Sequence, residues 1–402
     1  MEIAENQLIP VELDALAVPE PLSGRDGTNR CRTGTPQIGA DNDKDAVLAW
    51  LRRYANSPNT LANARREAER LLLWAWDRGK PLSSLTHEDF LNYKLFLADP
   101  QPAERWVMQT KQKVGRQDVR WRPFAGKLSD ATIRLSMTIL NSMMSWLVEA
   151  GYLVGNPLAL SKSRRKGTQE SVSRYLEVDL WDVVKEAIAA MPKETPRDRA
   201  FYARARWLFT LLFLGGLRIS EVVGNTMGDF FMRSDSQTGE QRWWLNVTGK
   251  GGKVRNVTAS AEMIAELGEY RRALGLPERP SQGERSPLLF PVAWHADHAR
   301  GRLPDPLTRS AIHGMVKDVF EDASNRWLAK GKSQEQAEKL KKASAHWLRH
   351  TASSRLANHK DVGLHHVRDT LGHSSLSTTS IYVHSEEDAR HAAVSGAHKI
   401  GW

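Results

Sequence analysis

The chain has 402 residues, with 57 Lys and Arg against 47 Asp and Glu, which gives a formal charge of +10. This length predicts two or three domains, and the single cysteine, Cys31, excludes a disulfide framework and a cysteine-based zinc site. A basic balance is typical of nucleic-acid partners, because contact with a polyanion releases counterions, although solubility explains the same charge. The sequence contains neither a long apolar run nor a secretory signal, which predicts a cytoplasmic protein without a membrane partner.

Residues 1–40 contain scattered prolines and glycines and predict a flexible N-terminal tail, with an arm that docks on a partner subunit as the alternative. Helical periodicity then continues to about residue 160. Thr86 and Ser129 stand at positions typical of helix N-caps, ahead of amphipathic runs. The pattern predicts a small all-helical domain over residues 41–160.

The stretch 99–128 interrupts this domain and carries seven bases against three acids, interleaved with Trp106, Trp121 and Phe124. Bases among aromatic rings can follow a phosphate backbone and stack on sugars or bases, which favours contact with DNA. A solvated basic loop anchored by its tryptophans is the alternative. The bases expected to bind DNA from the helical domain are Arg65, Arg116, Arg120 and Arg122.

Residues 161–174 are polar, basic and poor in apolar side chains, which predicts a linker whose Lys162, Arg164 and Arg165 contact DNA. Residues 175–402 form the second predicted domain, with a C-terminal tail from about residue 385. Two strands surround a glycine-rich turn within 242–257. Helices are expected at 177–191, 197–214, 308–327, 333–342, 346–358 and 363–371.

Nine of the 13 histidines lie from His346 onward, so a metal site is considered first. His346 and His350 have the spacing of two zinc ligands on a helix, but Arg349 lies between them and disfavours a bound cation. The turn Gly249–Lys253 is followed by a strand and lacks the Ser or Thr of a nucleotide-binding phosphate loop. A lysine at this hairpin tip suits groove contact or proton donation, although an exposed turn lysine is the favoured explanation of this feature by itself. No metal or cofactor is predicted.

Arg218 follows an apolar helix and two glycines, so we expect its side chain to be partly buried. A buried guanidinium needs an anion. Glu221 supplies one, either as a structural partner alone or together with an oxyanion that binds the rest of the guanidinium.

The motifs that carry chemistry occur in a specific order: Gly-Leu-Arg218-Ile-Ser-Glu-Val, Thr-Gly-Lys250-Gly-Gly-Lys, His346-Trp-Leu-Arg349-His-Thr, Leu-Gly-His373 and Thr-Thr-Ser-Ile-Tyr382. This ordered set closely resembles the tyrosine recombinase (phage integrase) family over residues 175–385. The segment Ala357–Val367 is slightly longer than is typical, and the stretch 99–128 enlarges the first domain. The resemblance implies a mainly α fold with a small antiparallel β-sheet, in which a helical core-binding domain precedes a mixed α/β catalytic domain.

The resemblance implies a site-specific DNA recombinase that cuts and rejoins strands through a 3′-phosphotyrosine intermediate, in integration, excision or cointegrate resolution of a mobile element. A type IB topoisomerase-like relaxing enzyme is the alternative. The partners implied are double-stranded DNA, a homotetramer on synapsed sites, and in some systems a second recombinase or accessory proteins. No cofactor is implied.

The resemblance also assigns a role to each motif. Arg218 and Arg349 neutralise the nonbridging phosphate oxygens, and Glu221 orients Arg218. Lys250 protonates the leaving 5′-oxygen, while His346 accepts the proton of the nucleophile. The remaining assignments are a phosphate hydrogen bond from His373, the nucleophilic oxygen of Tyr382 and a backbone phosphate contact from Lys253.

Overall fold

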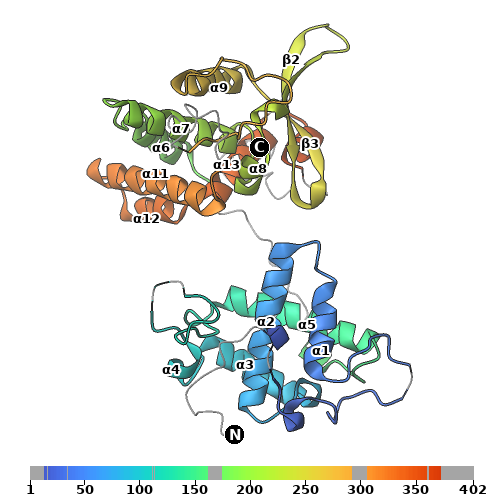
Figure 1. Cartoon of the computed structure of the whole chain (residues 1–402). Helices are drawn as coiled ribbons and strands as arrows, with labels where there is room; N and C mark the ends of the chain where they lie inside the picture. The colour runs from blue at the N-terminus through green and yellow to red at the C-terminus, as the bar shows by residue number, and fades with distance from the viewer. Residues whose placement is uncertain are drawn as a thin grey trace, which may run out of the picture. The chain divides into compact units, whose positions relative to one another are not determined.

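The computed structural model describes residues 13–15, 17–33, 35–110, 112, 114–161, 174–291, 306–359 and 362–372. The chain divides into two compact units, Met1–Gly167 and Thr168–Trp402, and each is described by itself (Figure 1). No helix within the described ranges combines the length and the apolar character needed to cross a bilayer.

The first unit is helical, and apolar side chains from its four longer helices form one core. Thr86 begins one helix with a capping box to Asp89, and Ser129 caps another, so both predicted N-caps are confirmed. The helices are α1 (Asp43–Arg52), α2 (Pro58–Asp77), α3 (His87–Ala98), α4 (Ala103–Trp106) and α5 (Asp130–Glu149). Short 3₁₀ turns lie at Leu13–Ala15, Glu20–Leu22, Leu82–Ser84 and Pro157–Ser161.

The structure differs from the predicted flexible tail over residues 17–33 and 35–40, which are bonded to the helical unit. The backbone N–H of Asn29 donates to the carbonyl of Ser83 over 2.8 Å, and that of Cys31 donates to the carbonyl of Tyr152 over 3.0 Å. The sequence pattern did not reveal this order, because the segment is held by backbone hydrogen bonds to distant residues and not by apolar side chains at regular spacing. We call residues 17–40 the N-terminal strap.

Asp43, at the start of α1, anchors this strap from inside the unit. Its buried carboxylate accepts hydrogen bonds from the Ser83 N–H over 2.9 Å and from the Tyr152 hydroxyl over 2.8 Å. Arg30 of the strap donates to the same hydroxyl over 3.0 Å and stacks on the Tyr152 ring. The strap, α1 and the chain after α5 therefore share one polar network.

Two of the three aromatic residues in the stretch 99–128 are core residues. Trp106 and Phe124 are fully buried, and each makes an edge-to-face contact with Phe96 of α3. Arg70 of α2 donates to the carbonyl of Pro123 over 2.9 Å and lies over the Phe124 ring. These two rings cannot stack on DNA bases, and this part of the stretch is anchored by its aromatic side chains.

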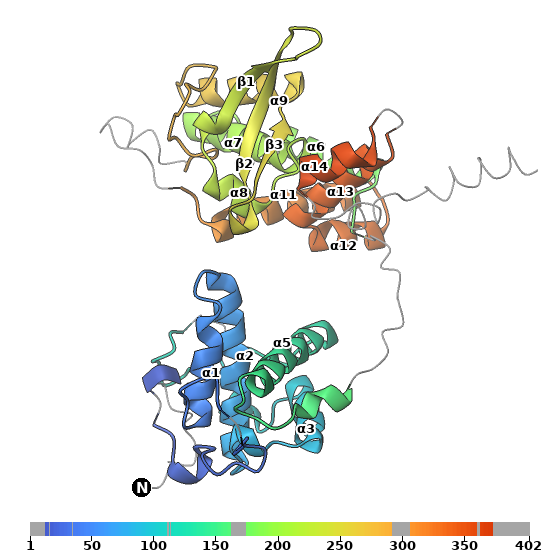
Figure 2. The same cartoon turned by 90° about the vertical axis from the view of Figure 1, so that its right-hand side faces the viewer.

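The second unit surrounds the helix α7, whose Trp207 is buried and donates its indole N–H to the carbonyl of Leu288 over 2.8 Å. Figure 2 shows α13 and α14 beside the sheet, and α14 packs against both α13 and β3. Helix α9 was missing from the prediction. The helices are α6 (Val178–Ala189), α7 (Pro196–Phe213), α8 (Ile219–Gly224), α9 (Ala261–Ala273), α11 (Arg309–Ala329), α12 (Gln334–Lys342), α13 (Ala345–Ala357) and α14 (Leu364–Leu371).

A three-stranded antiparallel sheet completes this unit, in the order β1 (Phe230–Ser234), β2 (Gln241–Thr248), β3 (Val254–Thr258). Leu245 of β2 pairs with Phe230 on one side and Val257 on the other, and all three side chains are buried. The sequence analysis expected only β2 and β3, because the short run of β1 has no clear alternation. The predicted class, mainly α with a small antiparallel sheet, is confirmed.

The close fit of the strap predicts that Gly24→Ala destabilises the first unit. Gly24 has a φ of +79°, and a methyl group there would lie 2.0 Å from the Asp43 carboxylate. We expect a loss of at least about 1–2 kcal/mol, the cost of a left-handed alanine, seen as a lower unfolding temperature. Gly39→Ala is the control, because no atom lies within 4 Å of the added methyl group. Equal stability of the two variants would contradict the structural role of the strap.

Candidate active site

The structure describes only some of the predicted site residues. Arg218, Glu221, Lys253, His346 and Arg349 lie within the described ranges, as does the backbone of Lys250. The predicted residues outside those ranges are His373, Tyr382, Lys162, Arg164 and Arg165.

Arg218 is the N-cap residue of α8, and its orientation is set by Glu221 one turn later. The backbone N–H of Arg218 donates to Oε2 of Glu221 over 2.9 Å, and its Nη1 donates to Oε1 over 2.8 Å. The Arg218 side chain is 35% exposed while that of Glu221 is 2% exposed. The carboxylate therefore holds the guanidinium from the protein side and leaves part of it open to solvent.

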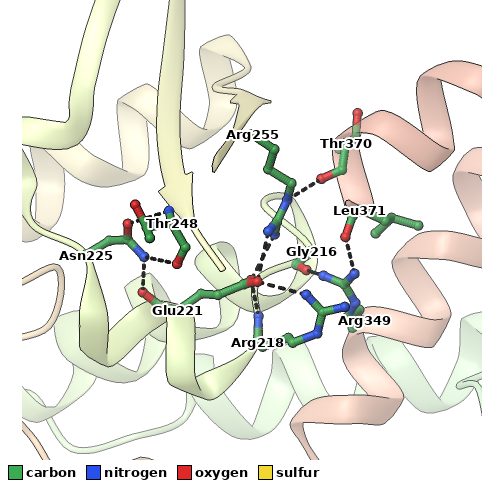
Figure 3. A network of polar contacts seen from close by, with 9 residues as sticks. All are labelled: Gly216, Arg218, Glu221, Asn225, Thr248, Arg255, Arg349, Thr370 and Leu371. Carbon is green, nitrogen blue, oxygen red and sulfur yellow. Dashed lines mark hydrogen bonds and ion pairs between the residues drawn. The ribbon is translucent and has the colours of Figure 1, made fainter. Parts of the chain in front are cut away.

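Arg255 of β3 is a second guanidinium on the same carboxylate, and the sequence analysis missed it. Its Nη1 and Nη2 donate to Oε1 and Oε2 of Glu221, both over 2.8 Å (Figure 3). Burial raises the pKa of the Glu221 carboxyl, but the bonds and charges of Arg255 and Arg218 outweigh it and lower the pKa to about 2. Glu221 is thus a permanent anion at neutral pH.

Strand alternation could have identified Arg255. Side chains two residues apart in a strand lie on the same face of the sheet, and Val257 is buried on the inner face. A charged residue two positions earlier is therefore expected to point inward and to need a partner. Asn225 was missed as well: its side chain donates to the Glu221 carbonyl over 2.7 Å and accepts from the Thr248 N–H over 2.9 Å.

Arg349 of α13 is buried, with 3% of the residue exposed. Its Nη1 donates to the carbonyl of Gly216, just before Arg218, and its Nη2 donates to the carbonyl of Leu371 at the end of α14 (Figure 3). One guanidinium thereby joins the turn before α8 to the end of α14. The structure thus brings the predicted Arg218, Glu221 and Arg349 together.

His346 and His350 lie one turn apart on α13, with ring centroids 5.7 Å apart and an interplanar angle of 21°. Although the His346 side chain is exposed, partial loss of hydration and the charges of Arg349, Arg218 and Arg174 lower its pKa. Burial and the charges of His346, Arg349 and Arg174 lower the pKa of His350 to about 4. Both rings are therefore neutral at pH 7, and an exposed neutral imidazole can accept a proton.

The Leu-Gly-His motif ends α14 with a left-handed residue. Gly372 has a φ of +63°, and a methyl group there would lie 2.8 Å from Cδ of Arg255. Both the backbone conformation and the passing arginine therefore require glycine. His373 follows directly in the chain.

The start of the turn between β2 and β3 also lies against this cluster. A methyl group at Gly249 would be 3.1 Å from Oε1 of Glu221. Lys250 is the next residue, within the 3₁₀ turn Lys250–Gly252, and Lys253 is exposed where β3 begins. The turn Gly249–Lys253 carries both predicted lysines, and its first residue thus lies against the carboxylate that orients Arg218.

The four arginines predicted to bind DNA from the first unit all have partners in the protein. Arg65 pairs with Asp14 over 3.1 Å, and Arg120 pairs with Asp118 over 2.7 Å. Arg116 pairs with Glu69 and stacks on Trp121, while Arg122 donates to the Glu104 carbonyl over 2.9 Å. A phosphate contact would have to replace or share these bonds, and the DNA-binding role of the four stays a prediction.

Comparison with known proteins gives a family match and many relatives. Residues 181–389 match the model of the phage integrase family. The tyrosine recombinase XerD of Shewanella oneidensis is 27% identical over 275 residues, which cover 67% of this chain and 77% of the relative. XerD of Haemophilus ducreyi is 27% identical over 311 residues, which cover 75% and 88%.

Two solved structures are similar in fold. The XerH site-specific recombinase in its post-cleavage complex with a palindromic difH substrate has a TM-score of 0.57 at 18% identity, covering 88% of this chain and 84% of that one. The Tn1549 transposon integrase in complex with transposon right end DNA has a TM-score of 0.51 at 17% identity, covering 88% and 99%.

The lowered pKa of His350 predicts an acid-sensitive contribution to stability. Between the ordinary value of 6.5 and about 4, the unfolded chain binds a proton at this ring that the folded protein excludes, so stability is lost as pH falls through this window. His350→Gln should flatten the decline of the unfolding temperature over that range. The exposed His313→Gln is the control and should follow the unchanged protein. Parallel profiles for all three proteins would contradict the assignment.

Proposed function

The chain belongs to the phage integrase family, and we propose from this membership that it is a tyrosine-type site-specific recombinase, which cuts and rejoins duplex DNA through a 3′-phosphotyrosine intermediate. The observation that carries the proposal is the family match over residues 181–389, which includes every motif from Arg218 to Tyr382. The relatives and structures named above are recombinases or integrases, so a topoisomerase-like relaxing enzyme is not favoured.

Charge at the cluster supports the assignment of a phosphate site. In the network of Figure 3, three guanidinium groups accompany the single carboxylate of Glu221. The excess positive charge suits the anionic, five-coordinate phosphorus of a transition state. Arg218 is the more exposed of the two arginines on Glu221, so it presents donors to the nonbridging oxygens.

The chemical step is a transesterification. The hydroxyl oxygen of Tyr382 attacks the scissile phosphorus and its proton passes to a base, for which neutral, exposed His346 is suited. The bond from phosphorus to the 5′-oxygen breaks, and Lys250 donates the proton that this oxygen needs. His373 donates a hydrogen bond to the phosphate. Attack by the 5′-hydroxyl of another strand reverses the step and rejoins the DNA without an external energy source.

We propose that both domains, residues 41–160 and 175–402, bind one duplex and that the basic segment 161–174 joins them. The bases of the segment and of the β2–β3 hairpin would track phosphates, which makes affinity strongly dependent on salt. Exchange between two duplexes breaks four strands, and each tyrosine breaks one, so the active assembly is a homotetramer on synapsed sites. The proposal extends to DNA that belongs to a mobile element. It also extends to a synapse that accessory proteins or a second recombinase join.

Covalent trapping tests the function. The probe is a nicked suicide duplex carrying the site recovered by binding selection from a random-sequence duplex pool. In EDTA, the unchanged chain should form a protease-sensitive adduct, because arginines take the electrostatic role of metal ions in two-metal nucleases. Tyr382→Phe should bind the duplex with similar affinity and form no adduct. An adduct with the Phe variant, or a requirement for a divalent ion, would overturn the proposal.

Lys250→Ala should slow cleavage by roughly 10²–10⁴-fold, the usual loss with a general acid, while binding changes little. The discriminating substrate carries a 5′-bridging phosphorothiolate, whose sulfur leaves without a proton. Rescue of Lys250→Ala, but not of Arg218→Ala, is expected. Lys253→Ala is the rival variant from the same turn, and its rescue in place of Lys250→Ala would move the acid to position 253.

A further inference from the structure

We propose that Arg255 is a positioning residue for strand cleavage: it holds Glu221, the start of the β2–β3 turn and the end of α14 in the arrangement that presents Arg218 to the scissile phosphate. The inference rests on the proposed recombinase function, and it assigns to Arg255 a role through Glu221 and Arg218 and not through the reacting atoms. Figure 3 shows its contacts with Glu221 and Thr370.

The first step concerns charge. Arg255 is 10% exposed and grips both oxygens of Glu221, whereas Arg218 is 35% exposed and reaches one of them with its side chain. The bidentate inner pair neutralises the carboxylate, so the charge of Arg218 stays available for a phosphate. Without Arg255, the buried carboxylate would rely on Arg218 alone and draw its guanidinium inward.

The second step concerns α14. Nε of Arg255 donates to the carbonyl of Thr370 over 2.9 Å, and its Cδ borders Gly372. The end of α14 is thereby fixed to β3 directly before His373. An arginine can hold the carboxylate and this carbonyl at once because its guanidinium has five donors in one plane.

The third step concerns the hairpin. A methyl group at Gly249 would lie 3.5 Å from Nη1 of Arg255, so the guanidinium borders the residue before Lys250. Arg255 is also part of β3 and pairs with Val247 across the hairpin. The Arg255 side chain therefore bonds Glu221, which orients Arg218, and borders the residues just before Lys250 and His373, so we expect its loss to misalign all three.

The test compares Arg255→Ala and Arg255→Lys with the unchanged chain on the selected suicide duplex. Arg255→Ala should lower the rate of adduct formation by roughly 10²-fold, the scale of a small misplacement of reacting groups, while the affinity for the duplex stays within a few-fold. Arg255→Lys keeps the charge but lacks the planar guanidinium that bonds both carboxylate oxygens. Its rate should therefore lie between those of Arg255→Ala and the unchanged chain. Unaltered cleavage by Arg255→Ala would overturn the inference.

Arg271→Ala is the matched control. Arg271 of α9 is also buried and grips both oxygens of a glutamate, Glu284, over 2.9 and 3.1 Å, and it also donates to a backbone carbonyl, that of Pro277. The hydrogen bonds described for it do not involve Arg218, Glu221 or α14. Removing it should reduce thermal stability comparably but leave the cleavage rate of the folded protein intact. Equal loss of cleavage in both variants would reduce Arg255 to a general stabilising role.

A modified substrate tests how Arg255 acts. A methylphosphonate at the scissile position lacks one anionic oxygen and so needs less help from Arg218. The rate deficit of Arg255→Ala, relative to the unchanged chain, should therefore shrink on this substrate. The rate of Arg271→Ala relative to the unchanged chain should be the same on both substrates. A deficit of the same size on both substrates would contradict the route through Arg218. If the unchanged chain forms no adduct with the phosphodiester, the recombinase function fails instead.

Discussion

A single buried carboxylate organises the catalytic unit. Glu221 accepts hydrogen bonds from the backbone and side chain of Arg218 and from both terminal nitrogens of Arg255, so each of its oxygens has two donors. Burying an anion is costly, and removing one partner of such a pair costs more than the pair contributes. The buried charge of Glu221 must therefore stay paired. This requirement fixes Arg218 at the start of α8 and Arg255 of β3, and through Arg255 it also fixes the end of α14.

Two arginine side chains of the candidate site also hold the end of α14 in place. Arg349 and Arg255 each donate to a carbonyl at the end of α14, at Leu371 and Thr370. The last carbonyls of a helix have no partner within the helix, and cations are favoured there by the helix dipole. The same positive groups that suit a phosphate also close this helix, so binding and folding share their determinants.

The sequence predicted the parts of the site whose partners are close in the chain. Arg218 and Glu221 are three residues apart, and the helices with a clear apolar period, such as α6 and α7, lie within a few residues of their predicted bounds. Arg255 was missed because its partners are 34 and 115 residues away, a pairing that no local pattern records. In the stretch 99–128, composition could not separate the buried rings of Trp106 and Phe124 from the half-buried Trp121, since all three belong to the same basic background.

The N-terminal strap changes where the first domain begins. Its backbone bonds to Ser83 and Tyr152, and the network around Asp43, make residues 17–40 part of the same cooperative unit as α1 and α5. A fragment that starts at residue 41 would leave the carbonyls of those two residues without these donors and would remove Arg30 from the Tyr152 hydroxyl. Any truncation that removes residues 17–33 or 35–40 therefore acts on the core of the helical domain.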